Sequence, residues 1–366
     1  MPKQTPFYSV HQKYGAKITE FAGYEMPVQY SSIKEEHLAV REKAGIFDVS
    51  HMGEFFVEGS EALDLVQYII TNDASKLDDG QALYTVMCRP NGGIIDDLLV
   101  YKLSGQRFML VVNAANREKD LKWITDNNSF NASVKDHSDD TCLLAIQGPE
   151  ALPILQELSS VKLDGIKFYH FTTGDIAGFD DVIISATGYT GEKGFELYFD
   201  KAKADPVKVW EAIMDKGKSR GIAPAGLGAR DTLRLEMGLA LYGNDLTEET
   251  NPIEARLGWL TKLGKDKFIG QDALKKVKEE GAQRKLYGFE VTDGKSVPRH
   301  GHQILDADGN SVIGTVTSGT RSISLNTNIG MGYVDIAYAK EDQDIKIQVR
   351  KRTVSAKTKK PPFLKK

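Results

Sequence analysis

The order of predicted strands and helices repeats along the first part of the chain, and this repeat limits the possible folds more than any other feature. Each copy reads strand, helix, three strands, helix, strand, because apolar residues recur at strand spacing and then at helical spacing. This order is close to that of a ferredoxin-like split βαβ unit, so we expect an α+β protein with two related antiparallel-sheet units. The first copy comprises Gly53–Val57, Ala62–Ile70, Ala82–Cys88, Ile94–Leu103, Phe108–Val112, Glu118–Thr125 and a short strand at Val134. The second comprises Cys142–Ile146, a helix with Pro149 in its first turn that reaches Leu158, Phe168–Thr172, Val182–Ala186, Phe195–Phe199 and Pro206–Lys216, and ends near Ile222.

The remaining sequence changes character twice. Residues 226–241 have helical spacing, and a charged helix is predicted at Asp272–Lys278. From Lys285 onward, short strands alternate with Gly, Asp and Asn, which is typical of a small all-β domain. The basic residues that end the chain indicate a solvated, frayed terminus more than a docking surface. The predicted strands are Leu286–Val291, Gln303–Leu305, Ser311–Thr317, Ile329–Val334 and Ile345–Arg352.

Composition excludes several classes of protein. Of the 366 residues, 41% are hydrophobic and 27% are charged, so disordered and fibrous classes are ruled out. The formal net charge of −4 argues against a general nucleic-acid binder. No apolar run approaches the roughly 20 residues of a membrane span, and the N-terminus lacks the apolar segment of a signal peptide. The two cysteines, Cys88 and Cys142, lie in apolar runs, which argues against a disulfide framework and fits a reducing cytoplasm.

The sharpest local motif is NGGIIDDLLVY at residues 91–101. Its Asn-Gly-Gly turn needs positive φ angles, and the strand that follows contains two carboxylates although aspartate is disfavoured in strands. Neighbouring side chains of a strand point to opposite faces, so only one of Asp96 and Asp97 can face a given site. Solvated aspartates at the strand entrance are the alternative, and the strand pattern by itself favours neither.

The loop 104–106 predicts a hairpin between this strand and the next one. If Leu103 pairs with Arg107, Asp97 lies opposite Asn113 on the neighbouring strand. This register would bring a carboxylate and an amide side by side on one face of the sheet.

The second motif is TGYTGEKGFE at residues 187–196. Its glycines either bring the backbone close to a ligand or simply turn the chain. Glu196 and Tyr198 share the strand face opposite the predicted core, where Glu196 faces either a site or water. In the repeated order this hairpin corresponds to the one that carries Asp97, so each copy would contribute one carboxylate to a shared cleft. The predicted core face carries Phe195, Leu197 and Phe199.

A third motif, GLGARD, begins at Gly226. Glycines at a helix start permit the close approach of a ligand, and Arg230 could clamp a carboxylate with two hydrogen bonds. Ion pairs on a solvated helix face are the commoner situation. The motif lacks the third glycine of a dinucleotide fingerprint.

The histidines give weaker signals. The sequence around His51 contains Asp48 and Ser50, but the members of a catalytic triad are usually assembled from separate segments, so we reject that reading. His300 and His302 are two residues apart, and a turn or surface role is more probable than a metal site. The chain contains no P-loop, no HExxH motif and no nucleophile elbow.

Taken together, these motifs resemble the aminomethyltransferase (T protein) family of the glycine cleavage system. The resemblance runs along nearly the whole chain, and several long motifs in the same order are far more specific than any single one. Its carriers are FAGYEMP at 21–27, FDVSHMGE at 47–54, GGIIDD at 92–97, QGP at 147–149, GYTGE at 188–192, GLGARD at 226–231 and TSGT at 317–320.

The resemblance implies a three-domain, cloverleaf-like fold around a folate channel, with two ferredoxin-like or antiparallel-sheet α+β domains and a C-terminal β-barrel or jelly roll. The expected domains are residues 1–50 with 138–246, residues 51–137 with 247–280, and residues 281–366. It implies a cytoplasmic one-carbon transferase that moves the carbon of an aminomethyl group from the lipoyl arm of the carrier H protein to tetrahydrofolate. No metal, pyridoxal phosphate or flavin is expected. The implied partners are the H protein and the P and L proteins of the same system, with no nucleic acid or membrane and a monomeric chain.

The resemblance also implies the site. The catalytic aspartate of the family matches Asp97. One departure concerns the tail, where the family often has an aromatic residue just beyond its Pro-Phe and this chain has Leu364. The implied folate-contacting residues are Met52, Tyr84, Asn113, Tyr189, Glu196 and Arg230.

Three other classes share parts of this pattern. A non-enzymatic folate-binding protein that maintains iron–sulfur enzymes would carry a Lys-Gly-Cys-Tyr-x-Gly-Gln-Glu motif, which this chain lacks. A folate domain of an amine-demethylating flavoenzyme would need a flavin domain. A purely structural subunit would have no reason to keep Asp97, Glu196 and Arg230.

Overall fold

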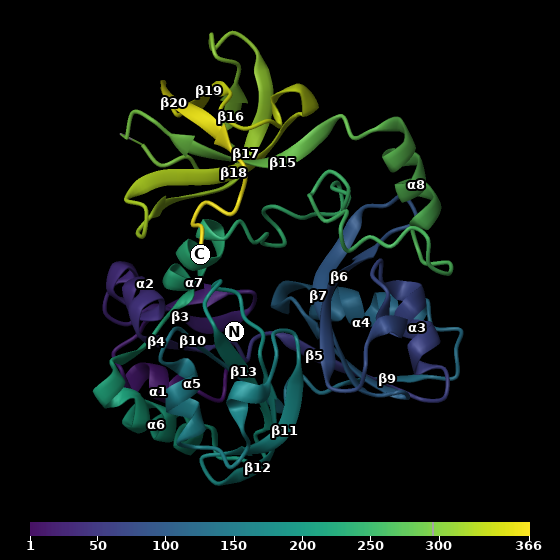
Figure 1. Ribbon diagram of the computed structural model, residues 1–366, viewed down its shortest axis with the longest axis vertical. Coiled ribbons are helices and arrows are strands. Elements are labelled where there is room, and N and C mark those ends of the chain that lie inside the picture. The colour runs from purple at the N-terminus through teal and green to yellow at the C-terminus, as the bar shows by residue number, and fades with distance from the viewer. Residues whose placement is uncertain (295) are drawn as a thin grey trace. The chain divides into compact units, whose positions relative to one another are not determined.

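The computed structural model describes residues 1–294 and 296–366 and confirms the α+β class (Figure 1). Its strands form three open sheets and one closed barrel. The chain divides into two compact units, which are described separately below. The first comprises Met1–Gln67, Ala74–Tyr84 and Leu98–Asp231, and the second comprises Tyr68–Asp73, Thr85–Asp97 and Thr232–Lys366. The three domain boundaries expected from the resemblance stay a prediction.

The first predicted copy forms a five-stranded sheet in the order β6-β7-β8-β5-β9. Apolar residues alternate along its strands because one face packs against the helices. Val57, Leu65 and Leu110 are all fully buried. The elements are β5 (Gly53–Glu58), α3 (Ala62–Ile69), β6 (Gln81–Cys88), β7 (Ile94–Ser104), β8 (Arg107–Val112), α4 (Arg117–Asp126) and β9 (Ser133–Asp136).

The second copy forms a six-stranded sheet in the order β11-β12-β13-β10-β4-β14. Strand for strand this is the order of the first sheet, with β4 inserted before the last strand. The duplication predicted from element order is therefore found in the topology as well. The elements are β10 (Thr141–Gln147), α5 (Ala151–Gln156), β11 (Phe171–Ile176), β12 (Phe179–Ser185), β13 (Gly194–Asp200), α6 (Pro206–Gly217) and β14 (Ile222–Pro224).

Helix α5 and strand β11 of this copy differ from their predicted bounds. Helix α5 begins at Ala151 with Glu150 as its N-cap, so Pro149 precedes the helix, and the helix ends at Gln156, two residues before Leu158. Strand β11 starts at Phe171 because Tyr169 has a positive φ of 59°, which interrupts an extended chain. Phe168, predicted as the first residue of that strand, is 74% exposed.

The N-terminal residues complete the first unit. Strand β4 enters the six-stranded sheet between β10 and β14, where it is antiparallel to β10 and parallel to β14. Helix α6 begins at an Asp205 N-cap whose side chain accepts two backbone N–H groups, and it buries Trp210 against Phe7 at a ring distance of 5.8 Å. Helix α7 (Leu227–Glu236) follows β14, and its residues up to Asp231 belong to this unit. The N-terminal elements are β1 (Lys3–Gln4), α1 (Tyr8–Lys13), β2 (Lys17–Phe21), β3 (Tyr24–Gln29), α2 (Ile33–Glu42) and β4 (Ala44–Asp48).

The predicted all-β domain is a closed barrel in the order β15-β18-β17-β16-β19-β20. The basic tail is not frayed, because residues 352–359 form the strand that pairs with β15 and closes the barrel. Beyond it, Phe363 is only 3% exposed. The alternation of basic and apolar residues, with Val354 and Ala356 buried, was the overlooked signal. The elements are α8 (Gln271–Glu280), β15 (Arg284–Val291), β16 (Gln303–Leu305), β17 (Val312–Ser322), β18 (Thr327–Asp335), β19 (Asp344–Val349) and β20 (Arg352–Lys359).

A buried ion pair ties the chain after α7 to the barrel. Helix α7 ends at Glu236, five residues before the predicted end. Arg234 Nη1 lies 2.7 Å from Asp245 Oδ2, and both side chains are almost completely buried. Thr317 and Ser318 of β17 donate further hydrogen bonds to the same carboxylate.

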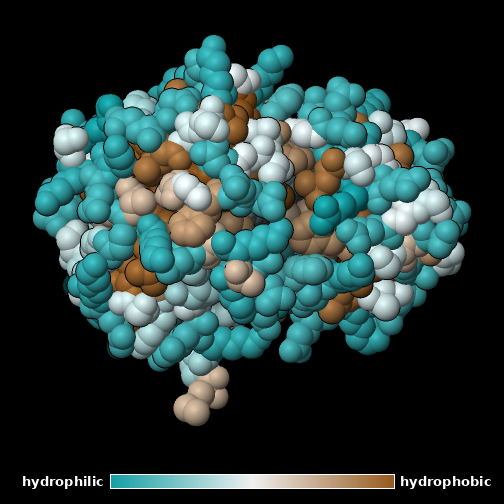
Figure 2. All heavy atoms as spheres, turned by 90° about the horizontal axis from the view of Figure 1, so that it is seen from below, coloured by the Kyte–Doolittle hydropathy of each residue, from teal (hydrophilic) through white to brown (hydrophobic). Residues whose placement is uncertain are grey.

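The face shown in Figure 2 is mainly hydrophilic, with hydrophobic residues in limited areas between hydrophilic ones. Among the described residues, no helix has the length and apolar character needed to cross a membrane.

We predict that Asp245→Ala destabilises the protein by about 3–5 kcal/mol, because it leaves the Arg234 guanidinium buried without its charge partner. Thermal and urea unfolding measure the change. The control is Asp344→Ala in the same barrel, which removes an exposed ion pair with Lys357 and costs at most about 1 kcal/mol. Equal losses in the two variants would contradict the assignment of Asp245 as the anchor.

Candidate active site

Glu196 lies on β13 in the first unit and is only 7% exposed. The strand pairs on both sides, with Glu196 opposite Ala145 of β10 and Ser185 of β12. The predicted core face is confirmed, since Phe195, Leu197 and Phe199 belong to one apolar cluster. The face that carries Glu196 is buried as well, so the alternative of a water-exposed carboxylate is wrong.

Hydroxyl groups surround this carboxylate. Thr187 Oγ1 donates to Glu196 Oε2 at 2.5 Å. Thr187 Oγ1 also lies 2.9 Å from Ser185 Oγ and 3.0 Å from Tyr101 OH. Tyr101 OH in turn lies 3.0 Å from Tyr198 OH. Sequence reasoning missed this network because its members come from separate segments and are ordinary strand residues when each is considered alone.

Arg230 brings a positive charge to the same region. The pKa of Glu196 is raised above its ordinary value, because burial outweighs the Thr187 hydrogen bond and the Arg230 charge, which lower it. The Arg230 guanidinium lies over the Tyr189 ring at 4.6 Å, a cation–π contact. Three residues predicted separately, Tyr189, Glu196 and Arg230, are therefore brought into one region of the first unit.

The glycines at the start of α7 have a packing role. A Cβ on Gly226 would lie 2.6 Å from the backbone of Val28, and one on Gly228 would lie 2.6 Å from the Ile33 side chain. In addition, the Gly226 N–H donates to buried Glu36 at 2.9 Å. The close approach inferred from these glycines is thus to β3 and α2, and it fixes the helix that carries Arg230.

Met52 and Asn113 lie at the ends of two paired strands. Strand β5 pairs with β8 so that Gly53 is opposite Val112. Met52 directly precedes β5 and Asn113 directly follows β8, so both side chains lie at the same end of the pair and are half-buried. Tyr84 is half-buried on β6.

Asp97 lies on β7, and its register was predicted almost correctly. Leu99 pairs with Val111, as the predicted register requires, although the pairing shifts near the turn so that Ser104, not Leu103, pairs with Arg107. Asp97 is half-buried and Asp96 is fully buried. The juxtaposition of Asp97 and Asn113 stays a prediction.

The rejection of a triad at His51 is supported by the partners of Asp48. Its carboxylate accepts hydrogen bonds from Thr5 at 2.6 Å and lies 2.9 Å from the His11 ring. His51 is buried, and burial followed by the Arg230 charge lowers its pKa to about 4. This ring is therefore neutral at physiological pH.

The other predicted histidine pair has local partners. His300 Nδ1 lies 3.0 Å from the Thr317 carbonyl, and His302 Nδ1 accepts from the Arg299 N–H. In the described part of the chain, no three His, Cys, Asp or Glu residues form a group that could hold a metal ion.

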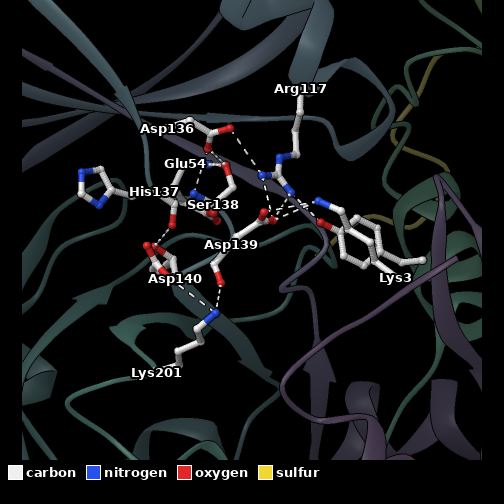
Figure 3. A network of polar contacts seen from close by, with 11 residues as sticks. Lys3, Glu54, Arg117, Asp136, His137, Ser138, Asp139, Asp140 and Lys201 are labelled. Carbon is white, nitrogen blue, oxygen red and sulfur yellow. Dashed lines mark hydrogen bonds and ion pairs between the residues drawn. The ribbon is translucent and has the colours of Figure 1, made fainter.

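Glu54 is a further buried carboxyl, and sequence reasoning missed it (Figure 3). Neither of its side-chain oxygens has a hydrogen-bond partner within the described residues. Burial raises its pKa well above the usual range, and the nearby Arg117 charge only partly offsets this effect. Arg117 donates to Tyr24, Asp136 and Asp139, so its hydrogen bonds go to other groups.

Two family models match most of the chain. The GCVT N-terminal domain matches residues 7–265, and the glycine cleavage T-protein C-terminal barrel domain matches residues 284–365. The chain belongs to the glycine cleavage T-protein family.

Relatives of this T-protein family member extend over its whole length. A Halothermothrix orenii protein named aminomethyltransferase is 52% identical over 362 residues, covering 99% of this chain and 100% of the relative. A Flavobacterium psychrophilum protein of the same name is 51% identical over 364 residues, covering 100% of both chains. The crystal structure of glycine cleavage system aminomethyltransferase T from Bartonella henselae matches with a TM-score of 0.92 at 34% identity, covering 100% of this chain and 98% of that chain. The T-protein resemblance inferred from motifs is confirmed.

We predict that Glu54→Gln raises the melting temperature at pH 8 and leaves it nearly unchanged at pH 5. Because the pKa of Glu54 is raised in the folded state, the free energy of unfolding is not reduced by this residue below the ordinary pKa of 4.5. It decreases as the pH rises from 4.5 toward the pKa of the folded state. A neutral amide removes this dependence. Thermal unfolding across this pH range measures the effect.

The matched control is Glu58→Gln on the same strand. Hydrogen bonding to Lys135 lowers the pKa of Glu58, and Arg107 also lowers it, so this carboxylate stabilises the fold above its ordinary pKa. The control should therefore gain nothing at pH 8. If the melting temperatures of both variants equal that of the unsubstituted protein at every pH, Glu54 is not a buried neutral acid.

Proposed function

We propose that this T-protein family member is the tetrahydrofolate-dependent aminomethyltransferase of a glycine cleavage system. The observation that carries this proposal is the buried Glu196 carboxylate beside the Arg230–Tyr189 pair, in a chain about half identical to full-length aminomethyltransferases. The substrates would be the aminomethyl group on the lipoyl arm of the H protein and tetrahydrofolate. The products would be 5,10-methylenetetrahydrofolate, ammonia and the dihydrolipoyl carrier.

The Glu196 carboxylate suits the pterin ring of folate. A reduced pterin presents a ring N–H next to an exocyclic amine, and a carboxylate can accept from both. Only Oε2 of Glu196 is engaged by the protein, and Oε1 has no hydrogen-bond partner among the described residues. A carboxylate held by one oxygen keeps acceptor positions free for a ligand.

The other predicted residues would enclose the rest of the folate. Arg230 could pair with a carboxylate of the folate tail, since guanidinium groups recognise carboxylates with two hydrogen bonds. Met52, Tyr84 and Asn113 are half-buried and so have surface left for a ligand. Tyr189 would contribute an aromatic face, which already carries Arg230.

Asp97 would hold and move a proton. In the proposed reaction N5 of tetrahydrofolate attacks the aminomethyl carbon, the carbon–sulfur bond breaks, and the sulfur leaves as the carrier thiol. Loss of ammonia then leaves an N5 iminium, which N10 attacks to close the ring. Ionised Asp97 would orient N10, accept its proton and stabilise the cation.

The system supplies the partners. The H protein would bring the aminomethyl group, and the P and L proteins would belong to the same multienzyme system. Two buried cysteines outside any disulfide fit the reducing cytoplasm. The chain would act as a monomer with transient partners. The iron–sulfur maintenance alternative is not favoured, because the full-length relatives carry the name aminomethyltransferase.

The deciding experiment measures ammonia release from aminomethylated H protein by the purified chain, with and without tetrahydrofolate. We expect release stimulated by folate, with 5,10-methylenetetrahydrofolate formed in equal amount. Folate binding without stimulated release would instead indicate a maintenance or structural protein.

For the catalytic aspartate, we predict that Asp97→Asn lowers turnover by about 10²–10⁴-fold while folate still binds, because the amide cannot accept the N10 proton. The control is Asp79→Asn, which changes an exposed carboxylate and should keep full turnover. Steady-state kinetics and calorimetric titration with folate separate the two effects. Near-normal turnover of Asp97→Asn would remove the proposed role.

A further inference from the structure

We propose that Tyr101, Thr187 and Tyr198 act as positioning residues that hold Glu196 as a carboxylate and fix its orientation toward the pterin ring. This inference deepens the proposed function and depends on it for the identity of the ligand. The three hydroxyl groups are called the hydroxyl relay below.

The relay engages one side of the carboxylate. Thr187 Oγ1 donates to Oε2 at 2.5 Å, and Tyr198 OH donates to the same oxygen over a longer 3.5 Å. Tyr101 OH bridges the two donors, since it lies 3.0 Å from each of them. Three hydroxyl groups have three hydrogens, so at most three of these four contacts are hydrogen bonds at one time. Together they fix the plane of the carboxylate and leave Oε1 for another donor.

The number of hydrogens sets the direction of the relay. A hydroxyl group has one hydrogen to donate, and the Thr187 hydrogen is directed to Glu196. Thr187 must therefore accept from its neighbours, Tyr101 at 3.0 Å or Ser185 at 2.9 Å. Such a chain ends on the carboxylate, and each donor polarises the next, which favours the ionised form of Glu196.

Aromatic packing keeps the two phenols in place. The rings of Tyr101 and Tyr198 meet edge to face at 5.5 Å, and Tyr101 also contacts the Phe171 ring at 5.3 Å. Tyr101 is fully buried and Tyr198 is 2% exposed. Burial raises the pKa of both phenols, so they remain proton donors throughout the physiological range.

Other charged and titratable groups face this cluster. Arg230 favours the charged form of Glu196. Burial, and then the Glu196 charge, raise the pKa of Tyr169 to about 12, so this phenol is neutral. The charge of Glu54 acts on Tyr198 and further raises the pKa of that phenol. The groups that oppose the desolvation of Glu196 are thus the Thr187 and Tyr198 hydroxyls, which donate to it, and the Arg230 charge. Tyr101 acts by donating to one of these two hydroxyls.

The charge state decides what Glu196 can bind. An ionised carboxylate accepts two parallel N–H donors from a pterin, whereas a protonated one presents an O–H group that clashes with one of them. Loss of the relay hydroxyls would raise the pH at which Glu196 becomes ionised. Folate binding would then weaken below this higher pH, where Glu196 is protonated.

The test compares Tyr101→Phe, Tyr198→Phe and the double variant with the unsubstituted chain. ¹³C NMR of the glutamate carboxyl groups follows titration in the folate-free protein, and the Glu196→Gln spectrum identifies the Glu196 signal. We expect the double variant to raise the Glu196 midpoint by about one pH unit, which is a tenfold change in its ionisation constant. An unchanged midpoint in the double variant overturns the relay whether or not folate binds.

The control is Tyr14→Phe, which removes a phenol bonded to Glu211 elsewhere in the first unit and should leave the Glu196 midpoint unchanged. Calorimetric titration with 5-formyltetrahydrofolate over the same pH range then tests the link to the ligand. We expect the folate dissociation constant of the double variant to follow the shifted midpoint, with KM for tetrahydrofolate raised and kcat at saturation nearly unchanged. Failure of the unsubstituted chain to bind folate at any pH would overturn the proposed function, while the NMR midpoint would still decide the relay.

Discussion

A buried carboxylate on a central strand is the constraint on which the first unit of this protein depends. Glu196 lies between two paired strands, and the residues on either side of it along β13 face an apolar core. A desolvated charge in that position is costly unless donors and an opposite charge surround it. The hydroxyl relay and Arg230 supply both, and the glycines of α7 bring that arginine close enough by packing against β3.

The two proposed site carboxylates lie on non-equivalent strands of the duplicated fold. By sheet order, β7 and β8 of the first copy correspond to β12 and β13 of the second. Asp97 is on β7 and Glu196 is on β13, so the two residues occupy the two different strands of equivalent hairpins. The copies share a scaffold, and the carboxylates have diverged within it, as expected if one moves a proton and the other binds a ring.

Much of the scaffold could be predicted from the sequence, because alternation of apolar residues marks strands whose one face is core. The five-stranded sheet, the register from Leu99 to Lys102 and helix α6 follow from local patterns. Errors arose where the local pattern was overridden. Tyr169 adopts a positive φ that delays β11, and the basic residues of β20 concealed a strand whose inner face is apolar.

The candidate site was predictable only where its residues lie in distinctive sequence segments. Gly-rich motifs and the family resemblance pointed to Glu196, Arg230 and Asp97, since these lie in distinctive segments. Glu54 and the relay tyrosines have no such local signature. Their importance comes from burial and from partners on other strands, which a single sequence without a register does not reveal.

The closing strand of the barrel has a consequence for how the barrel forms. Strand β15 pairs with β18 on one side and with β20 on the other. Because β20 follows β15 by many residues in the sequence, one edge of β15 stays unpaired until β20 has been made and has folded back onto it. An unpaired strand edge can pair with another chain, so any change that loosens β20 would expose the barrel to such association.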